Sequence, residues 1–153
     1  MAGVVEGIYV ASEGGAPMER VEEVEALKGC GLEGDRYCSG TGHWSRFGRD
    51  CEVTFVDAED LERIEKETGL RVKDGEHRRN IVARGVRLED LRRARFRIGE
   101  VVFGNGRPCS VCRYVERLSE PGMTRALRGR GGMCAKVLEG GRIRSGDAIV
   151  IPG

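Results

Sequence analysis

The hydrophobic residues of this chain occur mostly in short runs that glycines separate. Runs of this length, bounded by glycine, favour short strands joined by tight turns over a helical bundle. The pattern therefore predicts a mainly β protein with a few short helices. The expected strands are residues 4–11, 53–56, 80–83, 96–98, 101–103, 133–138 and 148–151.

Helical patterns are fewer than strand patterns. One helix is predicted to begin after Asp57, which resembles an N-cap and is followed by acidic residues in the first turn. Leu61 and Ile64 then share one face, and Gly69 is expected to end the helix. Shorter helical patterns cover residues 88–91, 114–118 and 124–128. We expect these helices to pack on a β framework as connectors.

Two segments of the chain resemble each other and support a closed sheet. Residues 97–103 (RIGEVVF) and residues 144–150 (RSGDAIV) both place a glycine and an acidic residue before an apolar strand. Such a pair of segments can supply two turn-to-strand entries of one barrel. The match is short, so it supports the barrel without defining it.

The length and charge of the chain limit the function classes. It has 153 residues, with 26 Lys and Arg against 25 Asp and Glu, and a formal net charge of +1. This length predicts a single domain over residues 1–153. Charges of both signs are interspersed, so no global field attracts nucleic acid or an anionic membrane. Aromatic residues make up 5% of the chain, which argues against a base-stacking platform. Neither nucleic acid nor membrane is therefore an expected partner.

The apolar runs also bear on localisation. None approaches the roughly 20 apolar residues that span a bilayer, and the first residues do not resemble a secretory signal. The sequence therefore predicts a cytoplasmic protein. In that compartment the cysteines are expected to be mostly reduced. They are Cys30, Cys38, Cys51, Cys109, Cys112 and Cys134.

The pair Cys109 and Cys112 is the most informative chemical feature. It lies between Arg107 and Arg113, where a predicted strand gives way to a helical pattern. A helix start carries a partial positive charge, and it favours a thiolate together with the flanking arginines. At least one of the two thiols is therefore expected to be nucleophilic or able to bind a ligand near neutral pH.

Four interpretations of this pair stay open. A structural zinc site would need two further ligands, and the candidates show no recognised spacing. A thioredoxin-like dithiol would need a βαβ surround that the strand-rich pattern lacks. The two cysteines could also be unreactive residues in a turn. The favoured interpretation is one working thiolate with its neighbour as a helper. The candidate zinc ligands are Cys38, His43, Cys51 and Cys134.

Two segments earlier in the chain could bind a ligand. Asp35 and Arg36 lie in a glycine-rich stretch and form either a functional pair or a turn that Asp35 caps. Arg79 and Asn80 run directly into a predicted strand. Arginine offers a planar set of donors for phosphate, and asparagine can fix a ring edge or a loop. A solvated charge run before the strand is the alternative.

A third segment, residues 125–132, is rich in arginine and glycine and lies beside a predicted strand. Its Arg128 and Arg130 could clamp an anionic group together with free backbone N–H groups. A mobile turn is the alternative interpretation. Taken alone, each of these segments is a weak signal.

The order of the segments is more specific than any one of them. It resembles the MOSC domain, a family named for the C-terminal domain of molybdenum cofactor sulfurases. The resemblance covers nearly the whole chain and implies a strongly bent, barrel-like β-structure in a small stand-alone member. The segments that carry it are GLEGDRY (31–37), RRNIV (78–82), IGE (98–100), PCSVC (108–112), GGMCAKVLEGG (131–141) and GD (146–147).

The same resemblance implies a site. The family binds the molybdenum cofactor (molybdopterin) or handles activated sulfur, with a cysteine near the PCSVC segment as its hallmark. This match places Cys112 at the widely shared cysteine, as a molybdenum ligand or a persulfide carrier, and Cys109 as a resolving or auxiliary thiol. Tyr37 departs from the histidine that is commoner there. The residues implied around the cofactor are Asp35, Arg36, Arg79, Asn80, Arg128 and Arg130.

Two versions of the function follow from the resemblance. In one, the protein carries or transfers sulfur in cofactor sulfuration or biosynthesis, with sulfur-donor or biosynthetic proteins as partners. In the other, it is a molybdenum-dependent enzyme that reduces N-hydroxylated compounds. The alternative from another class is a non-catalytic zinc-binding or interaction module that uses Cys109 and Cys112.

Overall fold

A computed structural model describes residues 2–39, 51–109, 118, 121–127, 130 and 132–152. Its helices are α1 (Arg36–Ser39), α2 (Ala58–Thr68), α3 (Leu88–Arg92) and α5 (Met123–Leu127). Its strands are β1 (Ala2–Val10), β2 (Glu19–Val21), β3 (Glu23–Leu27), β4 (Gly31–Leu32), β5 (Val53–Asp57), β6 (Ile81–Arg84), β7 (Phe96–Ile98), β8 (Val101–Pro108), β9 (Met133–Glu139), β10 (Gly141–Arg144) and β11 (Ala148–Val150).

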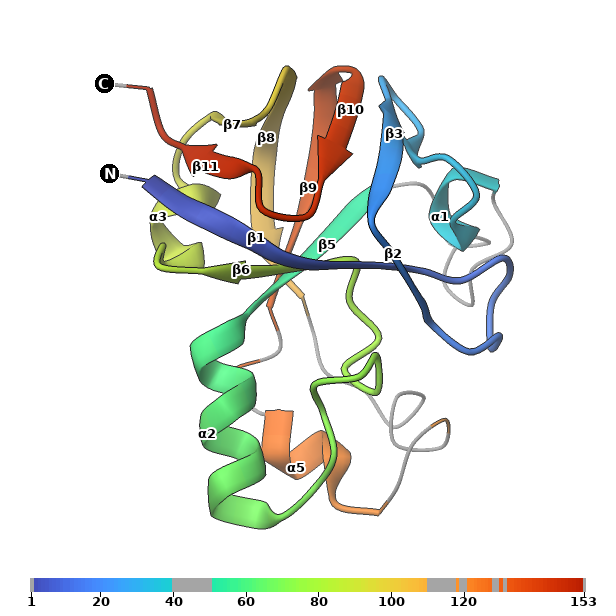
Figure 1. The fold of residues 1–153 in the computed structure, drawn as a ribbon, viewed down its shortest axis with the longest axis vertical. Helices are drawn as coiled ribbons and strands as arrows, with labels where there is room; N and C mark the ends of the chain where they lie inside the picture. The colour runs from blue at the N-terminus through green and yellow to red at the C-terminus, as the bar shows by residue number, and fades with distance from the viewer. Residues whose placement is uncertain are drawn as a thin grey trace.

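Seven strands close into a barrel in the order β11-β7-β8-β9-β5-β6-β1. Pairing of β1 with β11 completes the ring, so the two ends of the described chain lie side by side (Figure 1). Pairing within the ring is antiparallel except between β5 and β6, which run parallel. These seven strands are the seven that the sequence predicts, so the expected mainly β, barrel-like architecture is confirmed.

The interior of the barrel is a continuous apolar core. Phe55, Phe96 and Phe103 are fully buried at its centre. Their ring centroids lie 5.2 Å to 5.4 Å apart, in edge-to-face and stacked pairs. Because side chains alternate along a strand, every second residue of β5, β7 and β8 faces this core. The aromatic cluster therefore joins three strands that are far apart in sequence.

A second apolar cluster lies outside the barrel, where α2 and α5 pack below the strands (Figure 1). Leu61 and Ile64 are buried in it, as their spacing predicts. Gly69 ends α2 in the left-handed conformation at a φ of 74°, which is also as expected. Asp57 occupies the N-cap position, but its side chain makes no capping bond. Burial, reinforced by Asp60 and Glu59, raises the pKa of Asp57 to about 7.

The internal resemblance of 97–103 and 144–150 corresponds to two turns that enter barrel strands. Gly99 lies between β7 and β8 at a φ of 58°, and Gly146 lies between β10 and β11 at a φ of 92°. Both strands that follow, β8 and β11, pair with β7. The two related segments therefore lie beside each other in one closed sheet.

A small sheet of β10, β3 and β4 was not expected from the sequence. The hydrophobic pattern does not indicate this sheet, because β3 (EVEAL) and β10 (GRIR) contain few apolar residues. Arg142 pairs with both Glu23 and Glu25 across these strands, at 2.7 Å and 3.5 Å. Val24, Ala26, Leu32 and Ile143 turn inward to the core. Cross-strand ion pairs thus take the place of an apolar run on the exposed face.

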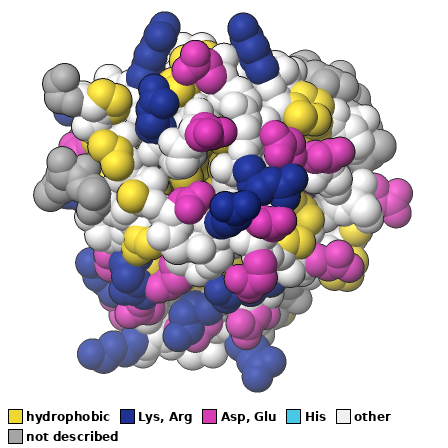
Figure 2. All heavy atoms as spheres, turned by 45° about the horizontal axis from the view of Figure 1, so that its top comes forward, with side chains coloured by type: hydrophobic (Ala, Val, Ile, Leu, Met, Phe, Trp, Pro, Cys, Tyr) yellow, Lys and Arg dark blue, Asp and Glu magenta, His cyan; other side chains and the backbone are white. Residues whose placement is uncertain are grey.

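The surface agrees with the balanced composition. Figure 2 shows basic and acidic side chains interspersed over one face, with small hydrophobic patches between them. In the described part of the chain, none of the helices is both long and apolar enough to cross a membrane.

Candidate functional site on the outer face of the barrel

A row of residues crosses five neighbouring strands at one level of the barrel. Cys134 pairs with Thr54 on one side and with Arg107 on the other. Asn80 donates its backbone N–H to the Thr54 carbonyl at 3.2 Å, and its own carbonyl accepts from Tyr9 at 2.7 Å. The next residues in these strands, among them Phe55, Ile81 and Met133, belong to the inner core. By alternation, the row faces outward.

The side chain of Asn80 links neighbouring strands of this row through hydrogen bonds. Its Oδ1 accepts hydrogen bonds from the Thr54 N–H and the Thr54 hydroxyl, each at 3.0 Å. Its Nδ2 donates to the Tyr9 carbonyl at 3.0 Å. Asn80 is fully buried, so these bonds replace lost hydration. The amide therefore positions strands, a role that differs from direct contact with a cofactor.

Asp35 and Arg36 form a buried ion pair, with 2.9 Å between Oδ1 and Nη1. The Asp35 carboxylate also accepts from the Ala11 N–H at 3.1 Å and from the Tyr37 N–H at 3.3 Å. The second of these bonds caps the short helix α1. Arg36 donates from Nη2 to the Arg78 carbonyl at 2.9 Å. The capping interpretation is therefore confirmed, and a functional role of the Asp35–Arg36 pair stays a prediction.

His77, Arg78 and Arg79 form a buried basic cluster beside that pair. Each of the three is at most 7% exposed. His77 Nδ1 accepts from the Arg79 N–H at 2.9 Å, while its Nε2 is buried without a hydrogen-bond partner among the described residues. Burial first, and then Arg79, Arg36 and Arg78, lower the pKa of His77 to about 3. The imidazole is therefore neutral at physiological pH.

Cys109 lies close enough to this cluster for Arg79 to affect the pKa of its thiol. Its backbone N–H donates to the Gly132 carbonyl at 3.0 Å. Burial raises the pKa of the Cys109 thiol, although Arg79, Arg107 and Arg36 act to lower it. Burial therefore outweighs the charges at Cys109, and the expectation that at least one of the two thiols ionises easily stays a prediction, because Cys112 lies outside the described residues. Three arginines from separate parts of the chain nevertheless act on one sulfur.

Four other cysteines form two disulfides, Cys30–Cys38 and Cys51–Cys134. The expectation that the cysteines are mostly reduced is wrong for these four. The fold brings each pair together over sequence separations of 8 and 83 residues, which spacing alone could not reveal. The disulfides also engage Cys38, Cys51 and Cys134, three of the four residues considered as further zinc ligands. The fourth, His43, lies outside the described residues.

The other predicted site residues differ in their outcome. Arg130 turns away to α2 and α5, where it donates to Glu67 at 3.2 Å and to the Ala126 carbonyl at 3.1 Å. Cys112 and Arg128 lie outside the described residues. Sequence reasoning missed His77 as a site residue. Its place directly before the RRNIV segment, three residues before Asn80, was the available signal.

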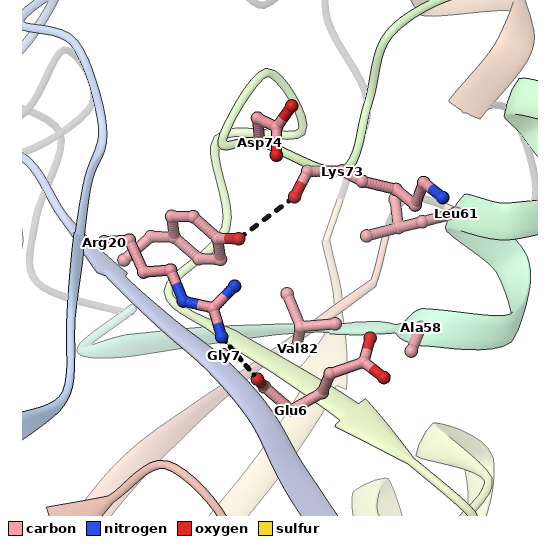
Figure 3. A pocket seen from close by; sticks show the side chains of 9 residues that line it. Glu6, Gly7, Arg20, Ala58, Leu61, Lys73, Asp74 and Val82 are labelled. Atoms are coloured by element: carbon pink, nitrogen blue, oxygen red, sulfur yellow. Dashed lines mark hydrogen bonds between the residues drawn. The ribbon is translucent and has the colours of Figure 1, made fainter.

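A polar pocket of about 200 Å³ lies on the same outer face, against β1 and the start of α2 (Figure 3). The Tyr9 hydroxyl donates to the Lys73 carbonyl at 3.0 Å, and Arg20 donates to the Glu6 carbonyl at 3.1 Å. Its charges are balanced, with Arg20 and Lys73 against Glu6 and Asp74. None of the predicted site residues lines it. The edge of the Tyr9 ring meets His77, with centroids 5.1 Å apart, so one side chain separates the pocket from the basic cluster.

Comparison with known proteins identifies the class. The model of the MOSC domain family matches residues 42–150, so the chain belongs to this family, and the resemblance in its motifs is confirmed. The family is associated with the molybdenum cofactor. No curated protein matches the sequence.

Solved structures share the fold at low sequence identity. The YuaD protein from Bacillus subtilis is 17% identical, with a TM-score of 0.70 over 97% of this chain and 94% of its own. YiiM from Geobacillus stearothermophilus is 17% identical, with a TM-score of 0.75 over 99% of this chain and 75% of its own. YiiM from Escherichia coli is 17% identical, with a TM-score of 0.69 over 98% and 70%. At these identities the likeness shows the fold alone.

Proposed function

We propose that this protein binds the molybdenum cofactor, or carries sulfur destined for it, with Cys112 as the working thiol. The sulfur version serves cofactor sulfuration or biosynthesis and has sulfur-donor or biosynthetic proteins as partners. The cofactor version serves the reduction of N-hydroxylated compounds. Membership of the MOSC family supports the association with the cofactor.

The observation that carries the proposal is the convergence of charge on the PCSVC segment. Arg36, Arg79 and Arg107 come from three separate segments, and all three act on the sulfur of Cys109. Cys112 follows Cys109 by three residues. Guanidinium groups stabilise phosphates and thiolates, so one cluster of arginines can serve either version of the function.

The donor set fits a molybdopterin. A thiolate is a soft ligand that suits a transition metal, and guanidinium groups suit the phosphate of the pterin. The buried Nε2 of His77, without a partner in the described chain, offers a further polar contact. In this proposal Arg36 and Arg79 hold the phosphate, Asp35 orients Arg36, and Asn80 keeps the strands in place. Arg130 is bound to Glu67, so it holds the phosphate only if it leaves that contact.

When bound, the cofactor would supply a metal centre able to accept an oxygen atom from an N-hydroxylated substrate. In the sulfur version, Cys112 holds a sulfane sulfur as a persulfide. The Cys109 thiolate then attacks the inner sulfur, which belongs to Cys112. A Cys109–Cys112 disulfide forms, and the outer sulfur leaves as hydrosulfide for the acceptor.

Replacing Cys112→Ser tests the proposal most simply. We expect C112S to lose both molybdenum content after reconstitution with the cofactor and persulfide labelling after incubation with a sulfane-sulfur donor. C30S/C38S is the matched control, since it removes both cysteines of the other disulfide and leaves no new free thiol. Retention of both properties by C112S would reject the assignment.

Arg79→Gln tests the basic surface. Loss of one charge-assisted contact costs about 1.5–3 kcal/mol, which corresponds to about 10- to 100-fold weaker cofactor binding. Arg142→Gln, which removes an exposed arginine of the small sheet, should bind as the wild type does. Elemental analysis of untagged protein separates the zinc-module alternative, which requires stoichiometric zinc and no molybdenum.

A further inference from the structure

Three cysteines meet beside the row on the outer face. The sulfur atoms of Cys51, Cys109 and Cys134 all lie within 4.8 Å of one another. Cys51 and Cys134 share a disulfide, and Cys109 is a free thiol. Cys134 is 2% exposed, whereas the other two are partly exposed. A disulfide and a free thiol are thus packed together, and the Cys134 side of the disulfide is shielded from solvent.

The backbone holds this arrangement in place. Arg107 of β8 pairs with Cys134 of β9, and the hydrogen bond from Cys109 to the Gly132 carbonyl extends that pairing past the end of β8. Gly132 has a φ of 96°, and a Cβ there would collide with the Phe55 carbonyl. Only glycine allows the chain to enter β9 so close to β5. Main-chain pairing therefore brings Cys109 beside the disulfide.

We propose that Cys51, Cys109 and Cys134 form a thiol–disulfide exchange centre that accepts electrons from anionic low-molecular-weight thiols. A side-chain rotation brings the Cys109 sulfur onto the disulfide. The Cys109 thiol gives its proton to water, and the thiolate attacks the Cys134 sulfur. The Cys109–Cys134 bond forms as the Cys51–Cys134 bond breaks, and Cys51 leaves as a thiolate that takes up a proton. This step moves the disulfide without any net redox change.

The exchange moves the partly exposed sulfur of the disulfide from Cys51 to Cys109, beside the three arginines. In the new disulfide the Cys109 sulfur is partly exposed, so an external thiolate can attack it and release Cys134 as a thiol. A second external thiolate then attacks the outer sulfur of the mixed disulfide and releases Cys109. In total, two external thiols lose two electrons and become one disulfide, while the protein disulfide becomes two thiols.

The arginines near Cys109 favour external thiols that carry a negative charge. Arg36, Arg79 and Arg107 all act on Cys109. A basic surrounding of this kind raises the local concentration of anions and disfavours cations. Glutathione, which carries a net negative charge, is therefore the appropriate probe, and cysteamine, which carries a positive charge, is its counterpart. This centre does not require the proposed role of Cys112, so it is tested in a C112S background.

The first experiment maps disulfides by mass spectrometry after equilibration of the full chain in a glutathione redox buffer. In C51S/C112S we expect a Cys109–Cys134 disulfide in most molecules, and in C134S/C112S a Cys51–Cys109 disulfide. The control C30S/C112S should keep the Cys51–Cys134 disulfide. If Cys109 remains freely alkylated in both test variants, the proposal is overturned. Cys51 is only partly buried, so C51S carries the test if C134S does not fold.

The second experiment measures the rate at which each thiol reduces the Cys51–Cys134 disulfide. Each rate is divided by that thiol's rate with a small model disulfide, which removes differences in intrinsic reactivity. We expect glutathione to react about tenfold faster than cysteamine with C112S, and this preference to disappear in C109S/C112S. Equal normalised rates, or a preference that survives the loss of Cys109, would overturn the proposal.

Discussion

The two faces of the barrel wall are built from the same strands but differ in almost every physical respect. Inward residues such as Phe55, Ile81 and Met133 are apolar and belong to one buried hydrophobic core. Their outward neighbours Thr54, Asn80 and Cys134 are buried as well, yet they are polar or chemically reactive. Burial therefore does not distinguish the two faces. Burial on the inner face stabilises the fold without requiring particular orientations of the groups, whereas the outer face holds polar groups in defined positions.

This difference shows how a small domain can combine a firm scaffold with a polar site. Hydrophobic burial is non-directional and tolerates exchange of similar residues, whereas a buried amide or guanidinium is costly unless its partners are in place. The outer row meets that requirement through Asn80, and beside the row the Asp35–Arg36 pair meets it as well. Mutations on the two faces should therefore differ in both size and kind.

The largest effect is expected on the inner face. Phe55→Ala removes a fully buried ring that contacts both Phe96 and Phe103. It should lower the free energy of unfolding by about 3–5 kcal/mol, as measured by urea denaturation. Val150→Ala, at an exposed position of β11, should cost about 0.5 kcal/mol or less. Similar losses in the two variants would contradict the assignment of the core.

A smaller effect is expected at the centre of the outer row. Asn80→Ala leaves the Thr54 N–H and the Tyr9 carbonyl without their side-chain partner. Unsatisfied buried groups of this kind cost about 1–3 kcal/mol each, and the lower part of that range for the two groups gives an expected loss of about 2–3 kcal/mol. A double-mutant cycle with Thr54→Val checks the cause, because the two changes should be non-additive. Strict additivity would show that Asn80 does not act through Thr54.

The smallest expected effect is a pH dependence of the free energy of unfolding, which arises from the buried imidazole of His77. The pKa of His77 is about 3 in the folded protein and near 6.5 when unfolded. The unfolded chain therefore binds more protons between these values, and the His77 contribution is lost as pH falls from about 6.5 toward 3. The slope reaches about 1.4 kcal/mol per pH unit.

His77→Asn provides the control, because its amide oxygen can still accept from the Arg79 N–H and does not titrate in this range. Unfolding free energies measured between pH 7 and pH 5 should converge, with the wild type losing about 1 kcal/mol more per unit than H77N. Parallel curves for the two proteins would show that His77 is not buried as a neutral imidazole.

The sequence predicts one face much better than the other. Apolar runs between glycines indicate all seven barrel strands, because inward packing leaves a clear pattern. The charged sheet of β3 and β10 leaves no such pattern and was missed. On the outer face, Arg79 and Arg36 act on the thiol of Cys109, and the roles that the motif order implies for Arg79, Asn80, Asp35 and Arg36 stay predictions. The motif order could not show that Asn80 bonds to strands or that Arg130 turns to Glu67.

The state of the cysteines was the least predictable feature. Flanking arginines are visible in the sequence, but the burial that outweighs them at Cys109 depends on the closed fold. Partners such as Cys51 and Cys134, 83 residues apart, meet only after β5 and β9 have paired. Neither effect is visible in the sequence, since burial and long-range pairing are properties of the tertiary structure.

The most direct test of the central claim is mass spectrometry of freshly isolated, untagged protein, first intact under native conditions and then as peptides. The account predicts either a bound pterin cofactor on the intact protein or the mass of one added sulfur on the peptide that contains Cys112. A protein with neither modification, even after exposure to cofactor and to a sulfane-sulfur donor, would contradict the claim that the basic outer face serves this chemistry.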